Sequence, residues 1–169
     1  AKNVAAQTGI RVMTWPGACE VHEMFSADDV EQLREAHPGV VILAHPECPP
    51  DVLEAADFAG STSALANYVA EESPNKVVLL TECSMSDNVA SANPNVNFIR
   101  PCNLCPHMKR ITLENIYDCL VTGEYEVLIP EDVRVRAKEA LDAMMALPKM
   151  VKPLAFKTGL KPLELEMVV

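Results

Sequence analysis

Residues 40–50 read V-V-I-L-A-H-P-E-C-P-P, and they carry most of the information on the fold class. Val40–Ala44 is an unbroken apolar run, the pattern of a strand buried on both faces of a parallel sheet. His45-Pro46-Glu47-Cys48 follows directly and stops the strand. Ligands of open α/β sheets bind beyond the carboxyl ends of the strands. The stretch therefore predicts a parallel sheet with a chemically capable loop at its edge.

The same order of strand, polar loop and helix recurs on both sides of this stretch. Further strands are expected at 10–15, 58–59, 76–81 and 97–100, and helices at 26–36, 51–56, 64–72 and 86–92. Such alternation is typical of an α/β fold with a mainly parallel sheet. Because parallel strands end at one edge, the polar loops after them are expected to gather there.

The flanking parts of the chain have a different pattern. Ala1–Gly9 reads as the last turns of a helix closed by glycine, so we expect the chain to be the C-terminal part of something longer. Residues 112–122 are expected to be helical, residues 124–129 extended, and residues 131–147 a long amphipathic helix. Residues 151–169 show no clear period and are expected to be a loosely ordered extension.

Composition excludes several classes of protein. The chain has 169 residues, is 49% hydrophobic and carries a formal net charge of −10, which argues against a nucleic-acid surface. No apolar run approaches the ~20 residues that span a bilayer. No signal-peptide pattern is present, so the cytoplasm is the expected compartment. Six cysteines in such a protein are expected to be free, catalytic or metal-bound instead of forming a disulfide framework.

Cys102-x-x-Cys105 is the motif with the most alternatives. A structural zinc site would need a second ligand pair, which the sequence lacks. A redox pair at a helix start fits roughly, although Pro106 follows the pair. An iron–sulfur cluster draws its thiolates from separate loops, and Cys19 lies in such a loop. Inert thiols are the fourth alternative, and spacing alone leaves all four open.

Two further motifs can carry chemistry or be purely structural. His45 and Glu47, two residues apart in an extended loop, can face one substrate as proton donor and acceptor. They can equally belong to a loop that merely ends a strand. Gly60-Ser61-Thr62-Ser63 offers backbone N–H groups and hydroxyls at a helix start, where anions bind, although ordinary capping is the commoner role. His22 is either a substrate contact or a loop histidine.

Five motifs, in this order and spacing, closely resemble the bacterial quinolinate synthase family. They are W-P-G-A-C-E-V-H-E-M-F (15–25), H-P-E-C-P (45–49), G-S-T-S (60–63), T-E-C-S-M (81–85) and C-P-H-M-K-R-I-T-L-E-N (105–115). The match extends to about Met150. The resemblance implies a transferase that condenses iminoaspartate with dihydroxyacetone phosphate to quinolinate in NAD biosynthesis. It also implies three similar three-layer α/β/α domains around a pseudo-threefold axis.

The resemblance also implies roles for individual residues. Cys19 and Cys105 would be two of the three cysteine ligands of one 4Fe–4S cluster that leaves one iron open to the substrate, with Cys102 a neighbour and not a ligand. His45, Pro46 and Glu47 would bind iminoaspartate, and Glu47, with His45, would serve proton transfer. Ser61 and Thr62 would contact the same substrate, and His22 would lie near the pocket.

The family pattern is incomplete in this chain. Its first domain supplies the third cluster cysteine and several substrate contacts, and none of those motifs is present. By resemblance, residues 1–19 end the second domain, 20–105 form the third and 106–150 are returning helices. We therefore expect the chain alone to be inactive. An L-aspartate oxidase is the implied source of iminoaspartate. The rival interpretation is a non-catalytic module that binds a metal or a partner through Cys102 and Cys105.

Overall fold

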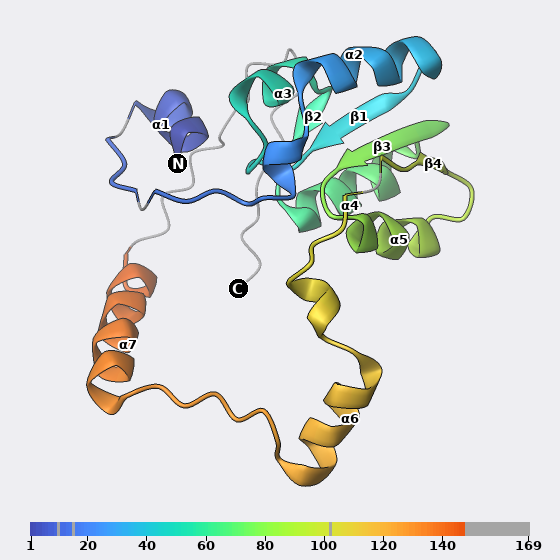
Figure 1. The fold of residues 1–169 in the computed structure, drawn as a ribbon. Helices are drawn as coiled ribbons and strands as arrows, with labels where there is room; N and C mark the ends of the chain where they lie inside the picture. The colour runs from blue at the N-terminus through green and yellow to red at the C-terminus, as the bar shows by residue number, and fades with distance from the viewer. Residues whose placement is uncertain (10, 15, 102, 148–169) are drawn as a thin grey trace. The chain divides into compact units, whose positions relative to one another are not determined.

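Four parallel strands form the sheet of this protein, in the order β2-β1-β3-β4 (Figure 1). Strand β1 is Val41–Ala44 and pairs with β2, Phe58–Ala59, on one side and with β3, Lys76–Leu80, on the other. Strand β4, Asn97–Ile99, extends the sheet beyond β3. In the central pair, Ile42 lies opposite Val78. The strands predicted at 40–44, 58–59, 76–81 and 97–100 are confirmed to within a residue or two, and so is the α/β class.

The computed structural model describes residues 1–147, apart from Ile10, Trp15 and Cys102. The predicted extension at 151–169 therefore lies outside the described residues. Within them the chain forms two compact units, residues 1–105 and residues 106–147, and the sheet belongs to the first. None of the described helices is both long and apolar enough to cross a membrane.

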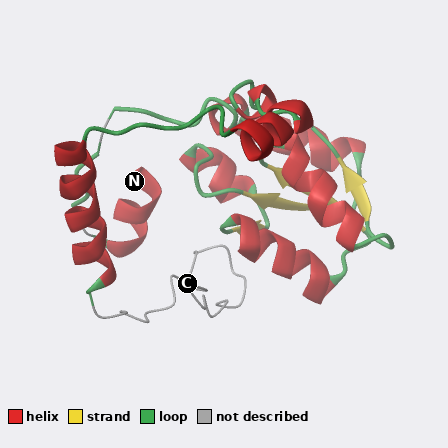
Figure 2. Cartoon of the chain, turned by 90° about the horizontal axis from the view of Figure 1, so that it is seen from below, coloured by secondary structure: helices red, strands yellow, loops and turns green. Residues whose placement is uncertain are grey.

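Helices cover both faces of the sheet and make three layers (Figures 1 and 2). Helices α2, Ala27–Ala36, and α3, Pro50–Ala55, lie on one face, and α4, Thr62–Glu72, and α5, Cys83–Ala92, lie on the other. Helix α2 begins where predicted, because Ser26 and Asp29 form a reciprocal capping box. The layering confirms an α/β/α domain.

Two apolar clusters hold these layers together, one on each face. Alternate residues of β1 point to opposite faces, so Ile42 belongs to the first cluster and Leu43 to the second, and both are fully buried. Burying such a side chain stabilises the fold by about 1.5–3 kcal/mol. The sheet is buried on both faces, which explains why the sequence of β1 is continuously apolar.

The segment before α2 differs in part from the prediction. Helix α1, Lys2–Thr8, ends at Gly9, whose φ of 70° is left-handed, as the glycine indicated. The strand predicted at 10–15 is wrong over the described residues 11–14, which are exposed and belong to no strand. A strand needs a neighbour for its backbone N–H and C=O groups, and none lies beside these residues in the described chain.

Residues 106–147 contain two helices and a short 3-10 turn, η2, Met108–Arg110. Helix α6, Leu113–Thr122, starts with a Thr112–Asn115 capping box and ends at Gly123. Helix α7 is Glu131–Met145. The extended piece expected at 124–129 forms no strand. None of residues 106–147 is buried, although an amphipathic helix such as the one predicted at 131–147 usually buries its apolar face.

Candidate functional site

The candidate site lies at the carboxyl edge of the sheet, where the four strands end together. His45 directly follows β1, Gly60 follows β2 and Thr81 follows β3. Beyond β4, Asn103 forms a parallel bridge with Glu82. The prediction that the polar loops gather at one edge is therefore confirmed for the described residues.

The loop from His45 to Cys48 is fixed by backbone hydrogen bonds. The His45 N–H donates to the Leu80 carbonyl at 3.2 Å, which continues the pairing of β1 with β3. The Cys48 N–H donates to the His45 carbonyl at 2.9 Å and closes a tight turn. The Glu47 N–H points to His45 Nδ1 at 3.3 Å. The turn leaves the Glu47 carboxylate 58% exposed beside two buried or half-buried imidazoles.

Helix α1 supplies a second support for this loop. The Asn3 side-chain amide donates to the carbonyls of Pro46 and Cys48, at 2.8 and 3.2 Å. These contacts join residues more than 40 positions apart in the chain. No sequence pattern marks Asn3, which looks like an ordinary helical residue, so only the structure reveals this role.

His22 is brought to the same loop by a short 3-10 turn, η1, His22–Met24. Its imidazole is only 6% exposed. Nε2 lies 3.1 Å from the Thr81 hydroxyl oxygen, and Nδ1 lies 3.0 Å from Glu47 Oε2. The Nδ1 contact has the distance of an ion pair but not the alignment of a hydrogen bond, so Nδ1 has no hydrogen-bond partner among the described residues.

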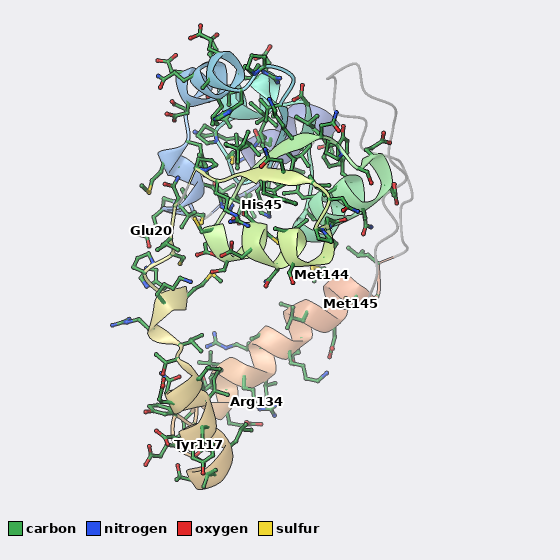
Figure 3. All side chains as sticks on the ribbon, turned by 90° about the vertical axis from the view of Figure 1, so that its right-hand side faces the viewer. Glu20, His45, Tyr117, Arg134, Met144 and Met145 are labelled. Carbon is green, nitrogen blue, oxygen red and sulfur yellow. The ribbon has the colours of Figure 1, made fainter. Side chains whose placement is uncertain are left out.

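The two histidines of the site stack on each other. The ring centroids of His22 and His45 are 4.5 Å apart and their planes differ by 15°. Burial lowers the pKa of both imidazoles below the ordinary value, and for His45 the neighbouring His22 lowers the pKa further. The Glu47 carboxylate opposes this shift in both pKa values without overcoming it. Both rings are therefore neutral at pH 7, so each can accept a proton and can donate or accept a hydrogen bond. His45 is labelled in Figure 3.

Cys19 completes this group of side chains. It lies just before η1, where its carbonyl accepts the Glu23 N–H at 3.0 Å, and its thiol is free and half-buried. Ligand atoms of Cys19, His22 and Glu47 all lie within 4.8 Å of one another, a set that can hold a metal ion. The role of Cys19 as a cluster ligand stays a prediction, and its half-buried thiol is accessible enough to bind a metal.

The other described cysteines differ in their fitness as metal ligands. Cys48 is 1% exposed, its Sγ donates to the Leu80 carbonyl at 3.5 Å, and burial raises the pKa of its thiol to about 12. It therefore stays protonated and does not fit a thiolate ligand. Cys83 takes part in a disulfide, and Cys119 is exposed on α6. Cys102 lies outside the described residues.

Cys105 is held at the site edge by Glu82. The Glu82 carboxylate accepts the Ser84 N–H at 2.7 Å, capping α5, and the Cys105 N–H at 3.4 Å. The Cys83 N–H donates to the Asn103 carbonyl at 3.1 Å. The backbone of Cys105 is thus held to the loop that follows β3, and its thiol is free and half-buried. Glu82 itself is 7% exposed, and the sequence marked it only as a polar residue after a strand.

The Gly60–Ser63 turn begins α4 at the same sheet edge. The Ser61 hydroxyl accepts the Ala64 N–H at 3.3 Å, so its present role is to cap the helix. Thr62 is exposed and, among the described residues, makes no hydrogen bond to His22, His45 or Glu47. At Gly60 a Cβ atom would lie 2.8 Å from both the Ala64 Cβ and the Phe58 ring. Close packing therefore requires glycine at this turn.

The comparisons with known proteins concern the family of the chain. A family model described as quinolinate synthetase A protein matches residues 1–146. The chain is 58% identical over 145 residues to a quinolinate synthase of Agrobacterium fabrum, covering 86% of the chain and 42% of that protein. It is 59% identical over 145 residues to quinolinate synthase 1 of Mesorhizobium japonicum, covering 86% of the chain and 45% of that protein.

A quinolinate synthase of Xylella fastidiosa gives 57% identity over 147 residues, covering 87% of the chain and 43% of that protein. The chain thus spans less than half the length of these relatives. Because the family model matches nearly all of the described residues, the chain belongs to the quinolinate synthetase A protein family.

Proposed function

We propose that this chain is part of a quinolinate synthase, which condenses iminoaspartate with dihydroxyacetone phosphate to quinolinate in NAD biosynthesis. One observation carries the proposal: Cys19, His22, His45 and Glu47 meet at the carboxyl edge of the sheet. These residues come from two separate motifs, and the chain is 57–59% identical to relatives that bear this name.

Cys19 and Cys105 are the residues that would hold the 4Fe–4S cluster, with the third cysteine outside this chain. Both thiols are free and half-buried, as metal-binding thiolates are, whereas Cys48 is kept protonated by burial. When bound, the cluster would supply an iron that acts as a Lewis acid on a substrate oxygen or nitrogen.

Glu47 is the group that would move protons during the condensation and the dehydrations. Its carboxylate is 58% exposed, so a substrate can reach it, while its backbone is fixed by the turn with His45. The neutral His22 ring lies 3.0 Å from Oε2 and can stabilise the carboxylate without a full opposing charge. His45 presents a second neutral ring to the same substrate.

The turn at Ser61 and Thr62 would bind a carboxylate or phosphate of the substrates. Both side chains are exposed at the start of α4, an 11-residue helix whose first N–H groups carry partial positive charge. A protein with net charge −10 needs such local donors to bind anions. We also propose that an L-aspartate oxidase supplies the iminoaspartate. The proposed location is the cytoplasm.

The proposal is tested by separating the proton-transfer residue from the metal ligands. In the whole protein, Glu47→Gln should keep the absorbance of the cluster and reduce quinolinate formation by about 10²- to 10⁴-fold, the usual contribution of a general acid–base group. The matched control is Glu54→Gln, an exposed glutamate of α3, which should change neither. Near-normal turnover in Glu47→Gln would remove the proton-transfer role.

The ligand assignment has its own control. Cys19→Ser and Cys105→Ser should each abolish the cluster absorbance, whereas Cys119→Ser and Cys102→Ser should keep it. A cluster that survives the loss of Cys105 would refute the assignment of that residue.

A second function is favoured by one observation, the compact Cys19, His22 and Glu47 group. Such a donor set also suits a single zinc ion. Metal analysis distinguishes the two functions, because a cluster brings iron with inorganic sulfide in equal amounts and a zinc site brings neither. Cys105→Ser should not affect a single ion at Cys19, but it should remove a cluster. The rival module binds its metal through Cys102 and Cys105. It would therefore lose the metal in Cys102→Ser as well as in Cys105→Ser.

A further inference from the structure

We infer that Asn3 is a positioning residue, whose side-chain amide holds the chain on both sides of Glu47 and so fixes that carboxylate in the site. Asn3 lies in the first turn of α1, and its Nδ2 lies 2.8 Å from the Pro46 carbonyl oxygen and 3.2 Å from that of Cys48. The contribution to the reaction rests on the function proposed above, whereas the hold on the turn does not.

The partners of the Asn3 amide determine its orientation. A side-chain amide has a donor end and an acceptor end, and only the donor end can bind a carbonyl oxygen. Because both contacts are to carbonyl oxygens, the NH2 group must face the turn. Its two hydrogens match the two acceptors, one for each. A carboxylate in the same place would have no hydrogen to donate and would repel both oxygens.

The two carbonyls belong to the residues on either side of Glu47. The Cys48 N–H donates to the His45 carbonyl at 2.9 Å and closes a four-residue turn, with Pro46 and Glu47 at its centre. The Pro46–Glu47 peptide is trans, so its C=O and N–H point in opposite directions. While Asn3 holds the C=O, the Glu47 N–H must point away from Asn3. The Glu47 nitrogen lies 3.3 Å from His45 Nδ1 on that other side.

This hold on the backbone matters because little else fixes the Glu47 side chain. The carboxylate is 58% exposed, so packing contributes little to its position. The backbone of the turn must supply that position, and a turn that opens would spread the carboxylate over several places. A reacting group that is misplaced by about 1 Å can lose much of its effect on the rate. Asn3 therefore contributes to the reaction without touching the substrate.

Support of α1 itself is the structural alternative for Asn3. Alanine has a higher helix propensity than asparagine, and the helix macrodipole favours aspartate in the first turn. Neither Asn3→Ala nor Asn3→Asp should therefore weaken α1, although both remove the donors from the turn. Asn3 is half-buried, so water can reach the freed carbonyls and bind them. We expect the fold to survive both changes.

Amide hydrogen exchange of the 169-residue chain, resolved by NMR, tests the hold on the turn. Exchange of the Cys48 N–H requires the turn to open, so Asn3→Ala and Asn3→Asp should each accelerate it by roughly tenfold. The matched control is Asn93→Ala at the end of α5. It removes a 2.8 Å hydrogen bond from a side-chain amide to the Val89 carbonyl, and it should leave exchange of the Cys48 N–H unchanged.

Two results of these measurements would overturn the inference. One is a Cys48 N–H that exchanges at the wild-type rate in both Asn3 variants. The other is loss of the main urea unfolding transition in both variants, because Asn3 would then support the whole fold and not the position of one carboxylate.

Turnover of the whole protein shows whether Asn3 acts through Glu47. Asn3→Ala should lower kcat by roughly tenfold, and Asn93→Ala should not. In the Glu47→Gln background, Asn3→Ala should change kcat by less than about twofold, because the carboxylate that Asn3 positions is already gone. A tenfold loss in both backgrounds would indicate a general structural effect and refute the positioning role. If wild-type protein makes no quinolinate, the proposed function fails, while amide exchange still decides whether Asn3 holds the turn.

Discussion

Residues 20–105 and residues 106–147 have equally clear capping signals for their helices, but only the first region has a buried core. Helix α2 in the first region and α6 in the second both begin with a reciprocal capping box, at Ser26 and Thr112. The first region buries two apolar clusters around its sheet, whereas no residue of the second is buried. Capping thus determines where a helix begins, but it does not provide a core.

The exposed apolar side chains of the second region make the contrast sharper. Leu113 and Leu120 of α6 are 82% and 81% exposed, and Tyr117, labelled in Figure 3, is 65% exposed. Isolated helices of 10–15 residues are marginal in water, because most helical stability comes from packing of the apolar face. We therefore expect α6 and α7 to contribute little to the unfolding free energy of this chain.

A matched pair of leucine truncations provides the largest expected difference. Leu43→Ala, in the fully buried centre of β1, should lower the unfolding free energy by about 2–5 kcal/mol, because it leaves a cavity. Leu120→Ala should lower it by less than about 0.5 kcal/mol, as for an exposed surface residue. Urea unfolding of the 169-residue chain measures both. Equal losses would show that α6 shares the core of the sheet.

Gly60 is expected to show the next largest effect. Gly60→Ala places a Cβ 2.8 Å from Ala64 and from the Phe58 ring, and overpacking of this kind costs about 1–3 kcal/mol. Gly123→Ala, at the end of α6, meets open space and is unfavourable only through its φ of 73°. It should reduce helix content by circular dichroism without moving the main urea transition. A silent Gly60→Ala would contradict the close packing of the turn before α4.

The two capping boxes allow the same change, the loss of an N-cap hydroxyl, to be compared in the two regions. Ser26→Ala should lower the global unfolding free energy by about 1 kcal/mol, the usual cost of a lost N-cap. Thr112→Ala should instead only fray α6, which is seen as faster amide exchange over residues 113–116. If the threonine variant shifted the urea transition as much as the serine variant does, the two regions would unfold together.

The smallest expected effect is a dependence of stability on pH that belongs to the sheet region alone. Burial lowers the pKa of His22 and His45 in the folded protein, so the unfolded chain binds protons more readily. Stability is then complete above about pH 6.5 and is lost as the pH falls towards the lower folded pKa. The slope of unfolding free energy between pH 7.5 and 5.5 should decrease in His22→Gln. An unchanged slope would assign the pH dependence to other groups.

Much of the fold could be predicted because its signals are local. The apolar run at Val40–Ala44 indicated a strand buried on both faces, and the capping residues Ser26 and Thr112 marked the starts of α2 and α6. The strand predicted at 10–15 is wrong over residues 11–14 for the complementary reason. A short extended pattern needs a partner strand, and pairing depends on parts of the chain far away in sequence.

The residues of the candidate site could be predicted from the sequence, but the contacts that hold them in place could not. The position of His45 and Glu47 after a buried strand placed them at the sheet edge, where the structure has them. Cys19 and His22 were assigned by family resemblance, and the structure brings both to Glu47. The supports of the site were missed, because Asn3, Thr81 and Glu82 act through contacts with residues far away in the chain.

By itself, the sequence determined the α/β class, most helix and strand positions and the edge at which polar residues gather. These properties depend on periodicity, capping and the direction of parallel strands, which are written in neighbouring residues. The tertiary structure decided that Cys48 is buried, how His22 is held between Thr81 and Glu47, and which apolar residues are buried. Burial lowers the pKa of His22 and keeps Cys48 protonated, whereas Leu120 is not buried and stays exposed to water. Burial is a property of the packed chain, so no local pattern could supply it.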